Sequence, residues 1–123
     1  MPTQPNRHPT ATGHQAESLA CSYLEGLGHH IVARNWRTRY CELDIVTRRQ
    51  NVIHIVEVKY RASKQWGSAT EYILSAKADR LARAANAWCQ AHQYTGAWQI
   101  DIVAIDGPLD GPEITYIANA LFS

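Results

Sequence analysis

The apolar positions of this chain follow helical spacing in some stretches and strand-like runs in others. A helix is predicted from about residue 12 to a stop at Gly28, with an apolar face made of Ala16, Leu19, Ala20, Tyr23, Leu24 and Leu27. A second helix is predicted over about 75–92, with an apolar face made of Leu81, Ala84, Ala85, Trp88 and Ala91. Short apolar runs predict strands at about 29–36, 98–105 and 114–117. These elements surround a further pair of strands in the middle of the chain.

That central pair is a predicted β-hairpin. Two runs rich in Val, Ile and Leu, at 42–48 and 52–60, are separated by the polar residues 49–51. A turn centred between Gln50 and Asn51 pairs residues whose numbers add up to 101. Asp44 then faces Glu57, and Glu42 faces Lys59. Directly opposed side chains have Cβ atoms roughly 4.5 to 5.5 Å apart, so two carboxylates at that distance repel unless a cation lies between them.

The hairpin therefore carries the candidate chemistry. Because alternate side chains of a strand share a face, Glu57 and Lys59 point to the same side as Asp44, while Val58 points into the core. Asp44, Glu57 and the main-chain carbonyl of Val58 are candidate ligands for Mg²⁺ or Mn²⁺, which prefer oxygen ligands. Such an ion would acidify water and offset negative charge at a phosphodiester. Lys59 would orient or deprotonate that water, or neutralise the developing charge. The alternative is a structural salt-bridge cluster on a half-exposed sheet.

Charge is segregated along the chain, although the net charge is only +1. The window from Arg34 to Arg83 holds eleven basic and five acidic residues, and beyond Arg83 there are four acidic residues and no basic ones. A basic region around a carboxylate cluster favours a phosphate-backbone partner. Arg61, Lys77 and Arg80 are the candidate nucleic-acid contacts, and an ordinary solvated surface is the alternative.

Length and composition add limits. The 123 residues are enough for one domain, which we expect to span 13–123 after a flexible tail at 1–12. The polar start and the lack of a long apolar run predict a cytoplasmic protein without a membrane span. The three cysteines, Cys21, Cys41 and Cys89, form no CxxC pair and are expected to be packing residues.

Several motifs in order resemble a known family. Asp44 followed by Glu57-Val58-Lys59 resembles the pattern of the PD-(D/E)xK nuclease superfamily, and a preceding helix Glu, Glu17, is similar to the layout of archaeal Holliday-junction resolvases. The chain more closely resembles the YraN family of small bacterial predicted endonucleases, over roughly residues 13–106. The resemblance is carried by AESLACSYLEGLGHHIVARNWR, ELDIV, IVEVKYR, WGSA, a Lys in the next helix and DIVAI. Ala16 and Cys41 stand where that family usually has Gly, and neither change removes a proposed ligand.

The resemblance implies a restriction-endonuclease-like α/β core, with a central mixed β-sheet flanked by helices. It also implies Glu17, Asp44, Glu57 and Lys59 as catalytic residues, Mg²⁺ or Mn²⁺ as cofactor, and nucleic acid as substrate, with structured or branched DNA preferred to RNA. Asp101 resembles a site carboxylate, but we expect it to be a buried structural partner. Trp66 is interpreted as a lid over the core rather than as a base-stacking platform.

Two alternatives to the nuclease remain open. One is a catalytically weak or inactive nucleic-acid-binding module that recruits a partner. The other is a subunit whose acidic C-terminal portion docks a partner protein. Dimerisation is a further hypothesis, since both strands of a duplex must be cut. Metal dependence separates the nuclease from both alternatives.

Overall fold

A computed structural model describes residues 11–61 and 77–120. In these ranges the elements are α1 (Ala11–Gly26), β1 (His30–Arg37), β2 (Glu42–Arg49), β3 (Val52–Arg61), α3 (Lys77–Ala91), β4 (Trp98–Asp106) and β5 (Glu113–Ile117). Each predicted helix and strand that lies in the described ranges is present, with ends within a few residues of the prediction. The WGSA segment, Trp66 and most of the predicted tail lie outside the described residues.

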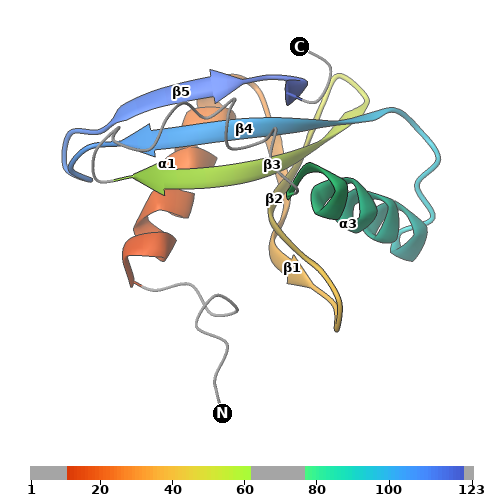
Figure 1. Ribbon diagram of the computed structural model, residues 1–123. Coiled ribbons are helices and arrows are strands. Elements are labelled where there is room, and N and C mark those ends of the chain that lie inside the picture. The colour runs from red at the N-terminus through yellow and green to blue at the C-terminus, as the bar shows by residue number, and fades with distance from the viewer. Residues whose placement is uncertain (1–10, 62–76, 121–123) are drawn as a thin grey trace.

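The strands form one mixed sheet in the order β1-β2-β3-β4-β5 (Figure 1). β3 and β4 are parallel, and the other neighbours are antiparallel. Parallel strands cannot be joined by a tight turn, so the chain crosses from β3 to β4 by way of α3. This topology confirms the predicted mixed sheet.

Two apolar clusters show that helices cover both faces of the sheet. Ile53 and Ile55 of β3 pack in one cluster with Trp88 of α3. Val56, which points the other way, packs with Leu24 of α1 in the second cluster, which we call the α1 cluster. The thiols of Cys21 and Cys89 are buried in these clusters, which confirms the prediction that they are packing residues.

The end of α1 is a Schellman motif, which the predicted stop at Gly28 anticipates. The His29 amide donates to the Leu24 carbonyl over 3.0 Å, and the Gly28 amide donates to the Glu25 carbonyl over 3.0 Å. Gly28 has a φ of 94°, a conformation that costs glycine little. The turn sets the direction in which the chain enters β1.

The β2–β3 hairpin has the predicted register over five pairs, from Arg49↔Val52 to Ile45↔Val56. Gln50 and Asn51 have φ values of 53° and 64°, as a two-residue type I′ turn requires. The predicted strand pairing of Asp44 with Glu57 and of Glu42 with Lys59 is wrong, because the ladder ends at Ile45↔Val56. The carboxyl groups of Asp44 and Glu57 nevertheless lie close together. Beyond that pair β2 stays bonded to β1, and Figure 1 shows the two strands curving away from β3 together.

Candidate active site

Asp44 lies where β2 separates from β3, one residue beyond the last ladder pair, Ile45↔Val56. We call this point the fork. Its carboxylate replaces the missing strand partner, because the Val58 amide donates a hydrogen bond to Asp44 Oδ2 over 2.9 Å. A main-chain donor freed by the fork thus finds an acceptor, and the carboxylate is fixed against β3. The side chain of Val58 packs in the α1 cluster, as predicted.

The electrostatics of Asp44 define the site. Burial raises the pKa of Asp44 well above its usual range, and the neighbouring charge of Glu57 raises it further. The Val58 hydrogen bond opposes this effect, whereas the charge of Glu17 and a hydrogen bond with the Glu57 side chain add to it. Glu57 is itself buried. Three carboxyl groups from α1, β2 and β3 are therefore close enough to disfavour a negative charge on Asp44.

Glu17 reaches this cluster because α1 contacts β1, β2, β3 and β4. Its Oε1 accepts a hydrogen bond from Asn35 Nδ2 over 3.0 Å and lies 3.8 Å from a guanidinium nitrogen of Arg34. Burial raises the pKa of Glu17, although the Asn35 hydrogen bond and the charges of Arg34 and His14 oppose this. The sequence-based condition for Glu17, that its helix packs across the hairpin, is met.

Asn35 is a positioning residue that sequence reasoning missed. Its backbone is left-handed, with a φ of 52°, and asparagine tolerates that conformation better than most residues. Its side-chain amide reaches Glu17, which lies eighteen positions earlier in the chain. Asparagine in a predicted strand was the available signal, but its partner could not be known without the fold.

Val58 and Lys59 complete the site at the edge of β3. The amide and carbonyl of one strand residue point to the same side, so the Val58 carbonyl faces the fork that its amide faces. Lys59 is half-buried and shares a strand face with Glu57. The structure thus brings the carboxyl groups of Asp44 and Glu57 together at the fork in the sheet, with Lys59 on the face of β3 that carries Glu57.

This donor set fits a hard divalent cation in part. Within residues 11–61 and 77–120, no group of three or more His, Cys, Asp or Glu side chains is arranged to hold a metal. Asp44 and Glu57 would therefore need the Val58 carbonyl, water and a substrate oxygen as further ligands. Mg²⁺ is commonly held in this way, by one or two carboxylates and substrate phosphates.

The three predicted nucleic-acid contacts have different environments. The Arg61 guanidinium forms a bidentate pair with Asp106, at 2.6 Å from Nε to Oδ1 and 3.1 Å from Nη2 to Oδ2. Both side chains are at least nine-tenths buried, so the charge of Arg61 is already compensated. Arg80 is exposed on α3, and Lys77 begins that helix. Arg80 is thus better placed than Arg61 to meet a phosphate.

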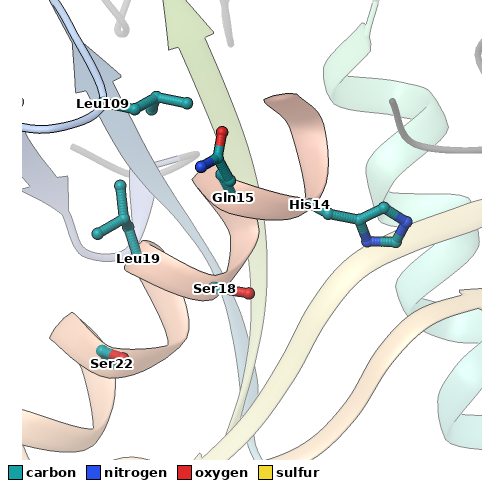
Figure 2. A pocket seen from close by; sticks show the side chains of 6 residues that line it. All are labelled: His14, Gln15, Ser18, Leu19, Ser22 and Leu109. Carbon is teal, nitrogen blue, oxygen red and sulfur yellow. The ribbon is translucent and has the colours of Figure 1, made fainter. Parts of the chain in front are cut away.

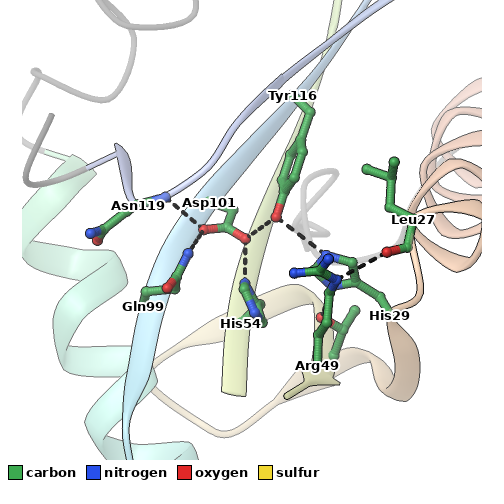
Figure 3. Close-up of polar contacts among 9 residues, drawn as sticks. Leu27, His29, Arg49, His54, Gln99, Asp101, Tyr116 and Asn119 are labelled. Carbon is green, nitrogen blue, oxygen red and sulfur yellow. Dashed lines mark hydrogen bonds and ion pairs between the residues drawn. The ribbon is translucent and has the colours of Figure 1, made fainter. Parts of the chain in front are cut away.

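A second polar cluster lies around Asp101 (Figure 3). Asp101 is completely buried and accepts hydrogen bonds from His54 Nδ1 at 2.6 Å, Tyr116 Oη at 2.5 Å, Gln99 Nε2 at 2.9 Å and the Asn119 amide at 2.8 Å. Burial alone would raise the pKa of Asp101, but these hydrogen bonds outweigh it and lower the pKa. Each oxygen of Asp101 has two donors, and one of the four is a backbone amide, which confirms the expected role as a buried structural partner.

A shallow hollow of about 370 Å³ lies between α1 and the β4–β5 connection. Figure 2 shows its lining, which is made of His14, Gln15, Ser18, Leu19, Ser22 and Leu109. None of the predicted site residues lines it. The hollow therefore adds nothing to the chemistry at the fork.

A mixed sheet with helices on both faces defines an α/β fold of the restriction-endonuclease-like class, and the carboxyl groups of Glu17, Asp44 and Glu57 lie close together at the fork in that sheet. In the described ranges, no helix is both long enough and apolar enough to cross a membrane. The model of the uncharacterised protein family UPF0102 matches residues 16–105, and the chain belongs to that family. This membership confirms the resemblance to YraN proteins.

Individual relatives match along most of their length. A UPF0102 protein of Methylococcus capsulatus is 36% identical over 114 residues, which cover 93% of each chain. A UPF0102 protein of Shewanella loihica is 40% identical over 108 residues, covering 88% of this chain and 91% of the relative. A relative from Stutzerimonas stutzeri is 36% identical over 118 residues, covering 92% and 96%. The similarity thus includes both helices and the strands of the fork.

Proposed function

We propose that this protein is a metal-dependent endonuclease that hydrolyses phosphodiester bonds in nucleic acid, with structured or branched DNA as the preferred substrate. The observation that carries the proposal is the pair of carboxyl groups of Asp44 and Glu57 at the fork between β2 and β3. Their proximity and burial raise the pKa of Asp44. A folded protein gains no stability from such repulsion, whereas a bound cation would relieve it.

Each residue of the fork has a role in this proposal. Asp44, Glu57 and the Val58 carbonyl would hold Mg²⁺ or Mn²⁺, and the bound ion would supply positive charge and make a nearby water more acidic. Lys59 shares the face of Glu57 and either orients that water or neutralises charge on the phosphate. Glu17 adds negative charge from α1 and is held by Asn35. Lys77 and Arg80 contact the nucleic-acid backbone.

The proposal is tested with labelled four-way junction, flap, single-stranded and duplex DNA, each with and without Mn²⁺. The wild type is compared with Asp44→Ala and Lys59→Ala, and with Asp110→Ala as a control, because Asp110 is an exposed carboxylate outside the fork. Metal-dependent cutting should be lost with Asp44→Ala, should fall about 100-fold or more with Lys59→Ala, and should persist in the control. Cutting that survives in both fork variants would contradict the assignment.

A second candidate function is a nucleic-acid-binding module that recruits a partner. The observation that favours it is that no three His, Cys, Asp or Glu side chains of the described residues are arranged to hold one metal ion. DNA binding without cutting, unchanged in both fork variants, would support this second function. For the nuclease we propose the cytoplasm as its location and a homodimer as the form that cuts both strands.

A further inference from the structure

The connection between β1 and β2 forms a braced tip at residues 38–41. The Thr38 amide donates to the Cys41 carbonyl over 2.8 Å, which closes the turn. The hydroxyl oxygen of Thr38 accepts hydrogen bonds from the amides of Tyr40, at 3.2 Å, and Cys41, at 3.3 Å. Figure 1 shows this end of the two strands extending away from β3, β4 and β5. The backbone around Tyr40 is therefore held in place at a protruding end of the molecule.

Tyr40 at this tip is 82% exposed, compared with 43% for Val32 and 42% for Leu27, the other large exposed hydrophobic residues in the described ranges. Tyrosine usually covers much of its ring against other residues. Here the ring meets the guanidinium of Arg39, whose central carbon lies 5.6 Å from the ring centroid. That distance is within the range of a cation–π contact. The tip thus presents an aromatic ring with a positive charge beside it.

The charge around the ring is suited to an anionic partner. Arg37 ends β1, and Arg39 is exposed in the turn. An aromatic ring beside arginines is the combination with which proteins bind single strands, because bases stack on the ring and phosphates pair with the cations. A peptide or a lipid surface would use the arginines but would gain less from one isolated tyrosine.

The tip is connected directly to the fork. Tyr40 comes four positions before Asp44 in the chain, a span of about 13 Å when extended. At the duplex spacing of about 3.4 Å per nucleotide, that span corresponds to roughly four nucleotides. A strand whose phosphate lies at Asp44 can therefore bring a nearby base to Tyr40. A base in an intact duplex is stacked between its neighbours and has no free face for the ring.

We propose that Tyr40 and Arg39 form a stacking platform for an unpaired base of DNA a few nucleotides from the fork. This inference rests on the proposed function and narrows its substrate to DNA with unpaired nucleotides, such as a flap or a splayed junction arm. The Tyr40 ring stacks on the base, and Arg37 and Arg39 pair with the flanking phosphates.

The test measures DNA binding in EDTA, where no cutting takes place. Fluorescence anisotropy compares a single-stranded oligonucleotide with a blunt duplex of the same sequence, for the wild type, Tyr40→Ala and Tyr40→Phe. Val32→Ala is the matched control, since Val32 is an exposed apolar residue on the same strand pair. Stacking on one aromatic side chain predicts that Tyr40→Ala weakens single-strand binding about 5-fold to 100-fold. Tyr40→Phe and Val32→Ala should bind as the wild type does, and duplex binding should change little.

A spectroscopic readout separates stacking from a general loss of affinity. 2-Aminopurine placed along the strand should be quenched by the wild type and by Tyr40→Phe at one position, and not by Tyr40→Ala. The inference is overturned if Tyr40→Ala binds single strands as tightly as the wild type, or if single-strand and duplex binding fall equally.

The outcomes for the platform and for the nuclease are distinct. Metal-dependent cutting with no effect of Tyr40→Ala on binding would leave the nuclease standing and reject the platform. A Tyr40-dependent preference for single strands without any cutting would support the platform and reject the nuclease. If the wild type binds no DNA in this assay, the platform is rejected.

Discussion

His54 Nδ1 lies 2.6 Å from Asp101 Oδ2, and an ionised carboxylate can only accept, so this ring nitrogen of His54 carries the proton. The hydrogen bond joins β3 to β4 inside the sheet. Tyr116 of β5 donates to the same oxygen over 2.5 Å. One buried carboxylate thus connects three neighbouring strands.

Removing the Tyr116 hydroxyl tests how much this network stabilises the fold. Tyr116→Phe takes one donor from a buried charge, so we expect a loss of about 1 to 3 kcal/mol in the free energy of unfolding. Tyr60→Phe is the matched control, because both rings pack against the α1 cluster. Urea unfolding of the three proteins gives the comparison. Equal losses in the two variants would show that the Asp101 contact contributes little.

The neighbouring His29 gives a prediction for acid stability. Burial lowers the pKa of His29, as do the charges of His54 and Arg49, while Asp101 opposes them. The unfolded chain therefore binds a proton at His29 near pH 6.5, where His29 of the folded chain stays neutral. The contribution of His29 to stability is complete above about pH 6.5 and is lost as the pH falls below it. One proton allows a slope of at most about 1.4 kcal/mol per pH unit.

Unfolding titrations between about pH 5 and pH 8 measure that slope. His29→Gln should flatten it, whereas His30→Gln, a change at the exposed neighbouring residue, should leave it unchanged. An identical slope in His29→Gln and the wild type would contradict the prediction. The lowered pKa of Asp101 acts in a separate and more acidic window, because its contribution is complete above the ordinary aspartate pKa near 4.

Asp44 should make the metal-free protein less stable at neutral pH. Its pKa is raised in the folded state, so the folded chain holds a proton that the unfolded chain releases, and stability falls as the pH rises from about 4 through the raised pKa. Asp44→Asn removes the charge and keeps an acceptor for the Val58 amide. We expect it to stabilise the protein in EDTA by about 0.5 to 2 kcal/mol.

Bound metal should make the wild type more stable than Asp44→Asn. Saturating Mn²⁺ should stabilise the wild type by about 2.7 kcal/mol at one hundred times the Kd, and should have little effect on Asp44→Asn. Thermal unfolding with and without Mn²⁺ provides the measurement, and Asp110→Asn serves as the exposed control. A wild type with no shift in Tm would count against a metal site at the fork.

Replacing Arg61 by Ala should mainly affect stability, whereas replacing Arg80 by Ala should mainly affect nucleic-acid binding. Arg61→Ala leaves the buried Asp106 without its partner and should cost about 3 to 5 kcal/mol of stability. Arg80→Ala changes an exposed residue of α3 and should alter stability by less than about 0.5 kcal/mol. If Arg80 contacts a phosphate, its loss should lower the slope of log affinity against log salt by about 1.

Unfolding curves and DNA-binding titrations at several salt concentrations separate the two effects. Asp106→Ala should destabilise the protein much as Arg61→Ala does, because it breaks the same ion pair. A wild-type affinity that does not depend on salt would refute the phosphate contacts.

Sequence alone determined the local geometry of the hairpin. Two runs rich in Val, Ile and Leu predicted the strands, and the polar residues 49–51 predicted the turn and therefore the register of five pairs. The alternation of side chains along β3 then predicted that Glu57 and Lys59 share one face and that Val58 points into the core on the other. These features follow from spacing within one short segment, so no distant partner was needed to infer them.

Only the tertiary structure decided where that register ends and which distant groups meet. β2 leaves β3 at Asp44 because it stays paired with the curved β1, and the carboxylate then binds the Val58 amide. Asn35 donates a hydrogen bond to Glu17, eighteen positions away in the chain. Arg61 forms an ion pair with Asp106, forty-five positions away. Such contacts depend on how the helices and the sheet pack together, and the residues next to each position in the sequence do not determine that packing.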